Sequence, residues 1–263
     1  MIRLVGIDVD GTLVGSQGRV HPDIWSAADR ARHAGIRLAL CSGRPAFGLA
    51  LEYARKLDPE GWHIFQNGAS VLNLSDGQSR SVTLPSESVS AFIAEARSSR
   101  RLLELYSDDD YVSESESAWA HEHAKLLGVP FEMRSFESLR GSVVRAQWLL
   151  PHADAKAWAQ TPRPAFETAL SSSPLMPDTT FVGITRAGVS KGSALQAITL
   201  EYGFDLKDVM YVGDSDNDLS ALKIVGHPVA MGNAADEVSR VATLSVGHVD
   251  AGGLAEALNA AIA

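Results

Sequence analysis

Two groups of carboxylates stand where apolar runs of the sequence end. Asp8 and Asp10 follow the first run, and Asp214, Asp216 and Asp218 end a second one within residues 208–218. Carboxylates held this close repel each other and resist the loss of water, so a fold that keeps them together needs a cation or a proton there. Carboxylate, carbonyl and water oxygens suit the hard, octahedral Mg²⁺ ion. The two groups therefore predict a magnesium site, provided that their strands end at one edge of a sheet.

A calcium loop and helix capping are the alternatives for these carboxylates. Asp214, Asp216 and Asp218 have the alternate spacing of an EF-hand loop, but Leu219 stands where that loop needs glycine and Val225 where it needs a bidentate glutamate. The sequence therefore excludes an EF-hand. Aspartates after strands also cap helices, which accounts for one group more readily than for both.

Strand and helix patterns alternate at both ends of the chain. A helix is predicted over residues 22–34, with Pro22 near its start and Gly35 at its end. Strands are also predicted over residues 2–8 and 36–41. Residues 63–68 and 227–233 each read as a strand that closes on a turn, and residues 208–218 as a strand that ends in carboxylates. Such alternation indicates a parallel sheet whose ligand site lies at the carboxyl ends of the strands. We expect an α/β fold, a Rossmann-like parallel sheet core with helices on both faces.

The middle of the chain has a different pattern. Residues 70–84 alternate around an Asp-Gly turn, as a hairpin does, and residues 172–176 and 179–185 form a second pair of strand-like runs. The acidic residues 107–117 between them read as a solvated loop. We therefore expect an inserted α+β cap domain. The predicted division is a core of residues 1–69 and 186–263, with the insertion at 70–185.

The composition restricts the classes of partner. The 263 residues are 45% hydrophobic and 21% charged, an ordinary balance for a soluble globular chain, and the net charge of −9 argues against a nucleic acid partner. No apolar stretch has the length of a membrane span. The single cysteine, Cys41, excludes an internal disulfide and fits a reducing compartment. We predict a cytoplasmic protein, as a monomer or a homodimer.

Four short motifs resemble, in order, those of the haloacid dehalogenase-like hydrolases. They are DVDGT (8–12), SGR (42–44), Lys191 and GDSDND (213–218). Two further segments resemble the boundaries of the cap in the Cof-type (type IIB cap) phosphatases, QNGA (66–69) and GVSKGSAL (188–195). The segment VAMGNAADEV (229–238) is similar to the one that follows the fourth motif there.

The resemblance implies two catalytic carboxylates. Asp8 would attack phosphorus and form an aspartyl-phosphate, and Asp10 would protonate the leaving alcohol and then deprotonate water. Asp10 would need a raised pKa, which a neighbouring carboxylate and partial burial would provide. Mg²⁺ would be held by the side chains of Asp8 and Asp214 and by the backbone carbonyl of Asp10. Asp218 would be a further ligand, or would contact the ligands without binding the ion.

The same resemblance implies a group that binds phosphate. The Ser42 hydroxyl, the Gly43 N–H and the Lys191 ammonium would hold the phosphoryl oxygens. Asn217 would donate to phosphate or fix Lys191. Arg44 is assigned to this group as well, with a pair to the acidic edge of the sheet as the alternative.

The resemblance thus implies a Mg²⁺-dependent phosphatase that acts on a small-molecule phosphate ester, a sugar phosphate or a similar compound. Two alternatives stay open. One is a phosphomutase that transfers the phosphoryl group within a sugar phosphate. The other is a non-catalytic protein that binds a phosphorylated ligand. The intact set of nucleophile, acid and phosphate-binding groups favours an enzyme over the binding protein.

Overall fold

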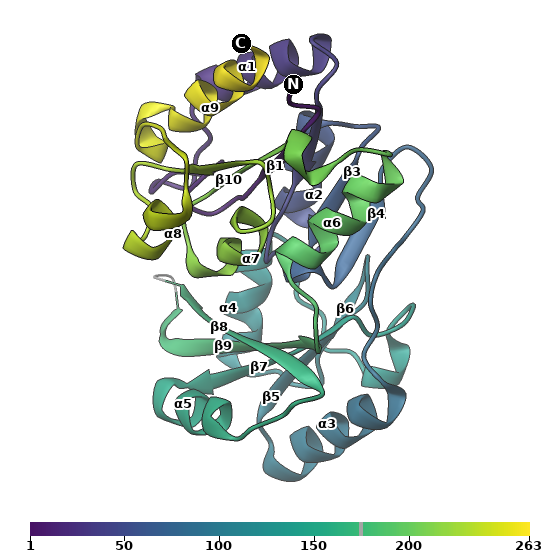
Figure 1. The fold of residues 1–263 in the computed structure, drawn as a ribbon. Helices are drawn as coiled ribbons and strands as arrows, with labels where there is room; N and C mark the ends of the chain where they lie inside the picture. The colour runs from purple at the N-terminus through teal and green to yellow at the C-terminus, as the bar shows by residue number, and fades with distance from the viewer. Residues whose placement is uncertain (174–175) are drawn as a thin grey trace. The chain divides into compact units, whose positions relative to one another are not determined.

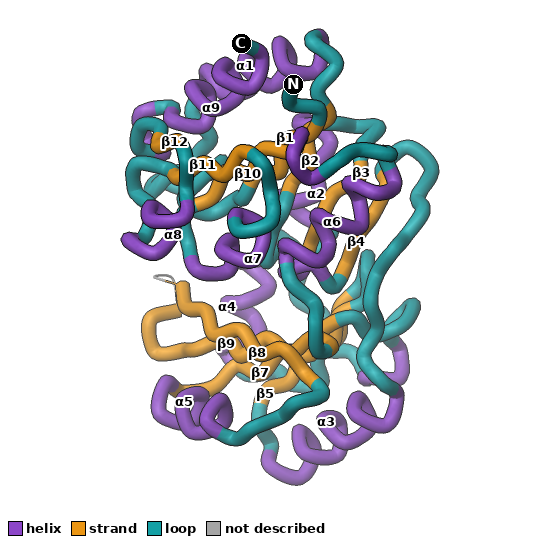
Figure 2. Tube along the Cα trace, in the orientation of Figure 1, coloured by secondary structure: helices purple, strands orange, loops and turns teal. Residues whose placement is uncertain are grey.

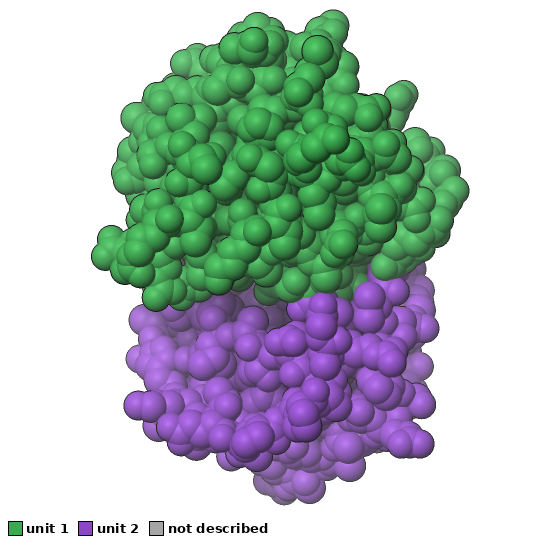
Figure 3. All heavy atoms as spheres, viewed as in Figure 1, with its two compact units in different colours: residues 1–44, 50–80, 190–263 green, residues 45–49, 81–189 purple. Residues whose placement is uncertain are grey.

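The chain divides into two units, which Figure 3 colours separately. The computed structural model describes residues 1–173 and 176–263. Unit 1 comprises residues 1–44, 50–80 and 190–263, and unit 2 comprises residues 45–49 and 81–189. The predicted boundaries are after residue 69 and before residue 186, whereas the two units divide after residues 80 and 189. Residues 70–80, which we expected in the insertion, belong to unit 1.

Unit 1 is built on a parallel sheet of five strands in the order β12-β11-β10-β1-β2 (Figure 2). Gly6 of β1 pairs with Tyr211 on one side and Ala39 on the other, so the first strand lies in the middle. β1 and β10 are buried throughout, which explains their continuous apolar runs. The strands are β1 (Leu4–Ile7), β2 (Arg37–Leu40), β10 (Val209–Gly213), β11 (His227–Ala230) and β12 (Leu244–Ser245).

Helices cover both faces of this sheet, as the sequence predicted (Figure 1). On one face, Leu4 and Tyr211 pack with Leu195 of α6, Leu222 of α7 and Val238 of α8. On the other face lie α1 and α9, which pack against each other. The helices that flank the strands along the chain are α1 (Pro22–His33), α2 (Gly48–Leu57), α6 (Lys191–Glu201), α7 (Leu219–Leu222), α8 (Asp236–Val241) and α9 (Gly253–Ile262).

The third predicted strand has another partner than expected. β3 (Trp62–Phe65) pairs antiparallel with β4 (Ser70–Asn73), and a single-residue bridge joins Ile64 of β3 to Cys41 after β2. The run 63–68 was expected to close on a turn, and residues 66–68 form a tight turn. The predicted hairpin is present, because the N–H of Arg80 donates to the carbonyl of Val71 across the turn.

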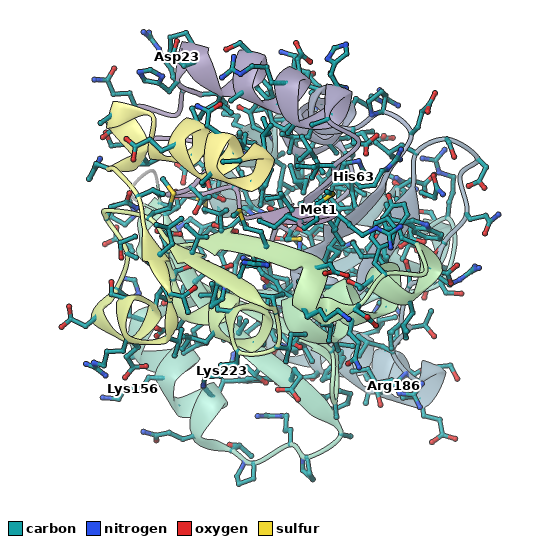
Figure 4. All side chains as sticks on the ribbon, turned by 45° about the horizontal axis from the view of Figure 1, so that its top comes forward. Met1, Asp23, His63, Lys156, Arg186 and Lys223 are labelled. Carbon is teal, nitrogen blue, oxygen red and sulfur yellow. The ribbon has the colours of Figure 1, made fainter. Side chains whose placement is uncertain are left out.

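A buried histidine replaces the missing strand pairing between β2 and β3. Nδ1 of His63 accepts from the N–H of Leu40 at 3.0 Å, so Nε2 carries the proton and donates to the carbonyl of Asp58 at 2.8 Å. Figure 4 shows His63 among the packed side chains, whereas Asp23 projects from α1. Burial lowers the pKa of His63 to about 4, so the ring is neutral at pH 7.

Unit 2 contains an antiparallel sheet of five strands in the order β6-β5-β7-β9-β8, which confirms the α+β insertion. One face packs Trp148 against Phe92 of α3 and Trp158 of α5, and the other packs Phe181 near Ala120 of α4. Its strands are β5 (Leu102–Tyr106), β6 (Tyr111–Val112), β7 (Arg145–Pro151), β8 (Phe166–Ser173) and β9 (Met176–Arg186). Its helices are α3 (Ser86–Ser99), α4 (Ala118–Leu127) and α5 (His152–Gln160). Over the described ranges, no helix of either unit has the length and apolarity that crossing a bilayer requires.

The acidic residues 107–117 are not simply a solvated loop, and that prediction is wrong for their centre. Asp110 is buried and accepts from Arg134 at 2.7 Å and from Arg140 at 3.3 Å. The next residues form β6, which pairs with β5. The second predicted pair of strands is present as β8 and β9, although residues 174–175 of the expected run 172–176 lie outside the described residues.

Candidate active site

The two carboxylate groups meet at the carboxyl edge of the central sheet. Asp8 follows β1 directly, and its N–H donates to the carbonyl of Val212 in β10 at 3.0 Å. Asp214 and Asp218 follow β10. One oxygen of Asp8, Asp214 and Asp218 lies within 4.8 Å of the others, so the three can share a cation. The parallel register of β1 and β10 is what brings residues so distant in the sequence together.

Lys191 lies between two of these carboxylates. Its Nζ donates to Oδ1 of Asp8 at 2.6 Å, to Oδ1 of Asp218 at 2.7 Å and to Oδ1 of Asn217 at 3.1 Å. It is the first residue of α6, whose start is fixed by a capping box between Ser190 and Ser193. Burial alone would lower the pKa of Lys191, but the charges of Asp8 and Asp218 outweigh it and raise the pKa above its usual value. The buried lysine is therefore a fixed positive charge.

Asp218 is fully engaged by protein donors. Its Oδ1 accepts from Lys191 and from the hydroxyl of Tyr211 at 2.6 Å, and its Oδ2 accepts from the N–H groups of Asp214 and Ser215, each at 3.1 Å. A carboxylate offers about four acceptor sites in total, and these four donors use them. Asp218 is thus suited to hold Lys191 and the loop after β10, and less suited to bind a metal directly.

Burial and the neighbouring carboxylates disfavour the charged forms of Asp8 and Asp214. Burial, and next the charge of Asp218, raises the pKa of Asp8 well above its usual range and raises that of Asp214 to about 6. Gly11 leaves room for Asp214, because a Cβ at this residue, whose φ is +86°, would lie 2.1 Å from Oδ2 of Asp214. Hard oxygen donors that crowd each other in this way fit a divalent cation.

Asp10 has a different environment from the one we expected. Its side chain is 64% exposed, so the partial burial predicted for it is absent. Arg44 donates to it with two nitrogens, Nε at 3.0 Å and Nη2 at 2.5 Å. Although burial opposes the charge of Arg44, the bond to Asp10 raises the pKa of this guanidinium. In this structure Arg44 thus binds the acidic edge, the alternative role considered for it.

Ser42 and Gly43 follow β2 at the same edge of the sheet. Oγ of Ser42 accepts from the N–H of Arg44 at 3.0 Å, which closes a short turn. A Cβ at Gly43 would lie 3.2 Å from Oδ1 of Asn67, so a larger residue would crowd this amide. Asn217 lies near the same place, because its Nδ2 donates to Oδ1 of Asn67 at 3.2 Å.

Sequence reasoning missed the four residues that support this arrangement. Asn233 donates to the carbonyl of Gly11 at 2.8 Å and to Asp214 at 3.3 Å, which orients the loop after β1. The others are Thr12, Asn67 and Tyr211. Thr12, Asn67 and Asn233 lie inside segments that resemble the family, so the resemblance could have pointed to them. Tyr211 lies in an apolar run and gave no such signal.

Curated relatives match nearly the whole chain. A phosphoglycolate phosphatase of Methanothermobacter thermautotrophicus is 26% identical, over 98% of this chain and 97% of the relative. The 5-amino-6-(5-phospho-D-ribitylamino)uracil phosphatase YwtE of Bacillus subtilis is 24% identical, over 97% and 96%. Both relatives are named as phosphatases, with different phosphate esters.

Solved structures share the fold of both units. A haloacid dehalogenase-like hydrolase from Bacteroides thetaiotaomicron has a TM-score of 0.84 at 24% identity, over 99% of each chain. The subclass IIB sugar phosphatase BT4131 has a TM-score of 0.80 at 22% identity, over 98% of each chain. The family model described as haloacid dehalogenase-like hydrolase matches residues 5–258. With its motifs gathered at one sheet edge and an antiparallel insertion between them, the chain belongs to the haloacid dehalogenase-like hydrolases.

Proposed function

We propose that this hydrolase is a Mg²⁺-dependent phosphatase that cleaves a small phosphate monoester through an aspartyl-phosphate on Asp8. One observation carries the proposal: Asp8 and Lys191 form a buried ion pair of 2.6 Å at the edge where the other motifs meet. The ammonium can bind a phosphoryl oxygen while the carboxylate faces phosphorus. A nucleophile and an electrostatic anchor are thus adjacent before substrate arrives.

In the first step, a carboxylate oxygen of Asp8 attacks phosphorus in line with the leaving alcohol. The bond between phosphorus and the ester oxygen breaks, and its electron pair stays on that oxygen, which takes a proton from Asp10. Lys191, the Ser42 hydroxyl and the Gly43 N–H hold the three other oxygens. The pair between Arg44 and Asp10 opens for this step, because a proton on Asp10 weakens it.

In the second step, water attacks the phosphorus of the aspartyl-phosphate. Asp10, now a carboxylate, takes a proton from the water, and the bond between phosphorus and Asp8 breaks. Inorganic phosphate leaves, and the Asp8 carboxylate returns to Lys191. The bidentate contact of Arg44 stabilises the charged form of Asp10 that this step requires.

Asp8, Asp214 and the backbone carbonyl of Asp10 would hold Mg²⁺. When bound, the ion supplies the positive charge that lets an anionic nucleophile approach a phosphate dianion. The crowding of Asp8, Asp214 and Asp218 supports this assignment. In this assignment Asp218 does not bind the ion and instead accepts a hydrogen bond from Lys191.

The class of substrate is supported by the relatives. Two proteins of nearly equal identity to this chain are named for phosphoglycolate and for a ribitylaminouracil phosphate. We therefore propose a small phosphate ester, with sugar phosphates included. We also propose a cytoplasmic location, which suits a chain whose one cysteine, Cys41, is free and buried.

The test is phosphate release from a panel of monoesters by the wild type, Asp8→Asn and Asp216→Asn. The panel holds hexose phosphates, phosphoglycolate, pyridoxal phosphate, flavin mononucleotide and a nitrophenyl ester. Asp216 is exposed in the same loop as the site carboxylates and serves as the control. Release by the wild type and Asp216→Asn, but not by Asp8→Asn, is expected. Release by Asp8→Asn would remove it as nucleophile, and transfer between sugar hydroxyls without release would indicate a phosphomutase.

A further inference from the structure

A strained turn lies beside the candidate site. Gln66, Asn67 and Gly68 have φ angles of 52°, 56° and 103°, so three successive residues have positive φ. Residues other than glycine adopt this region rarely, and they persist in it only where the surroundings hold them. Asparagine is among the residues that tolerate it best. The residues around the turn must therefore hold it in this conformation.

Hydrogen bonds and close packing hold the turn in place. The N–H groups of residues 66–67 donate to the carbonyls of Arg44 and Ser42, each at 2.9 Å. On the other side, a Cβ at Gly68 would lie 2.3 Å from the carbonyl oxygen of Ser190, just before α6. The turn is thus fixed between the loop after β2 and the start of the helix that carries the catalytic lysine.

The side chain of Asn67 contacts both halves of the predicted phosphate-binding group. Its Oδ1 accepts from Nδ2 of Asn217 at 3.2 Å, and Oδ1 of Asn217 accepts from Nζ of Lys191 at 3.1 Å. The same amide lies against Gly43, since a Cβ there would be 3.2 Å from its Oδ1 and 3.4 Å from its Nδ2. One amide thus links the Gly43 backbone to the Asn217–Lys191 pair.

We propose that Asn67 is a positioning residue of the reaction. Its amide sets the separation between the Gly43 N–H and the Lys191 ammonium, the two donors that would hold the transferring phosphoryl group. The inference rests on the proposed phosphatase function and adds a residue to it. Catalysis by fixed donors depends on their placement to a fraction of an ångström, so loosening them reduces turnover more than it reduces stability.

The test uses Asn67→Gly, which deletes the amide and keeps the positive φ accessible. Arg100→Gly is the matched control, because Arg100 has φ 57°, is exposed and ends α3 in unit 2. We expect Asn67→Gly to lower kcat by about 10-fold to 100-fold and to weaken competitive inhibition by inorganic phosphate. Arg100→Gly should leave both unchanged. Wild-type kcat and phosphate inhibition in a folded Asn67→Gly would overturn the proposal.

Two further variants keep the test decisive. If Asn67→Gly does not fold, Asn67→Asp serves in its place, because it retains the acceptor for Asn217 and tolerates positive φ. Its new negative charge should weaken phosphate binding. Unchanged phosphate affinity would overturn the proposal. Because Asn67 acts through Asn217, the double variant Asn67→Gly/Asn217→Ala should lose little more kcat than the worse single variant, and additive losses would contradict this route.

Measurements of phosphate binding and ester hydrolysis by the wild type distinguish a failure of this inference from a failure of the proposed function. A wild type that binds inorganic phosphate but hydrolyses no ester overturns the phosphatase proposal, and phosphate affinity then decides on Asn67. A wild type that neither binds phosphate nor hydrolyses an ester overturns both.

Discussion

Nζ of Lys191 donates a hydrogen bond of 2.7 Å to Oδ1 of Asp218, and neither side chain has any accessible surface. Removing two charges from water is costly, and the cost is offset only where geometry and further hydrogen bonds satisfy both groups. Here Asp218 also accepts from Tyr211 and from two backbone N–H groups. The pair therefore joins the stability of unit 1 to the position of the Lys191 ammonium.

Asp218→Asn should destabilise the protein strongly. The amide turns an NH₂ group either toward the ammonium or toward two N–H donors, so donors face donors whichever way it is oriented. Breaking a buried pair costs about 3–5 kcal/mol, and we expect a loss of this order in the free energy of unfolding by urea. Asp216→Asn, at an exposed residue of the same loop, should change it little. Equal stability of the two variants would contradict the assigned role.

Mg²⁺ should stabilise the folded protein without any substrate present. A ligand that binds only the folded state adds about 2.7 kcal/mol at one hundred times its Kd, so Tm should rise when Mg²⁺ is added to protein treated with EDTA. Asp214→Asn removes a proposed ligand and should abolish most of that rise. An equal rise of Tm in this variant would exclude Asp214 from the metal site.

Arg44→Gln should impair turnover and leave stability nearly unchanged. The pair with Asp10 is partly exposed, and such pairs contribute about 1 kcal/mol or less. Without the guanidinium, Asp10, the proposed acid and base, loses the group that holds it, and we expect kcat/KM to fall by about tenfold or more. Arg19→Gln, at an exposed arginine of unit 1, is the control. The same kcat/KM in both variants would remove Arg44 from the site.

The buried His63 should make the protein less stable in mild acid. Its pKa is about 4 when folded and near 6.5 when unfolded, so between these values the unfolded chain binds the extra proton. The resulting contribution is complete above pH 6.5 and is lost as the pH falls toward 4, by about 3 kcal/mol in all. His63→Gln can keep both hydrogen bonds but does not titrate. Its unfolding free energy should therefore fall less between pH 7 and pH 4.5, and identical pH profiles would contradict this explanation.

Much of the fold could be predicted because local patterns and the fold agree. The continuous apolar runs of β1 and β10 indicate strands covered on both faces, and the Pro22 start of α1 is visible in the sequence. The pairing of β3 could not be predicted, because the side chain of His63 replaces backbone hydrogen bonds between β2 and β3. The acidic run around Asp110 misled us because its arginine partners come 24 and 30 residues later.

The candidate site was predictable as a set of residues but not as a geometry. Asp8 and Asp214 each follow a predicted strand, and the carboxyl ends of parallel strands share one edge of a sheet, so the sequence indicates that the two residues meet. No local signal shows that Asp10 is exposed and bound by Arg44, or that Tyr211 occupies one acceptor of Asp218. Such contacts depend on side-chain placement across strands, which a single sequence does not encode locally.

The central strand β1 is synthesised long before one of the two strands that pair with it. β1 is made first, yet its neighbour β10 comes about 200 residues later, and Asp8 meets Lys191 across 183 residues. All strands of the unit 2 sheet emerge before either β10 or Lys191 does. During synthesis, the nascent chain therefore carries an apolar strand with one open edge, and Asp8 lacks its lysine partner. Residues 191–263 supply first Lys191 and then β10, which closes that edge, so a chain that stalls before residue 191 exposes an unpaired strand edge and lacks this lysine.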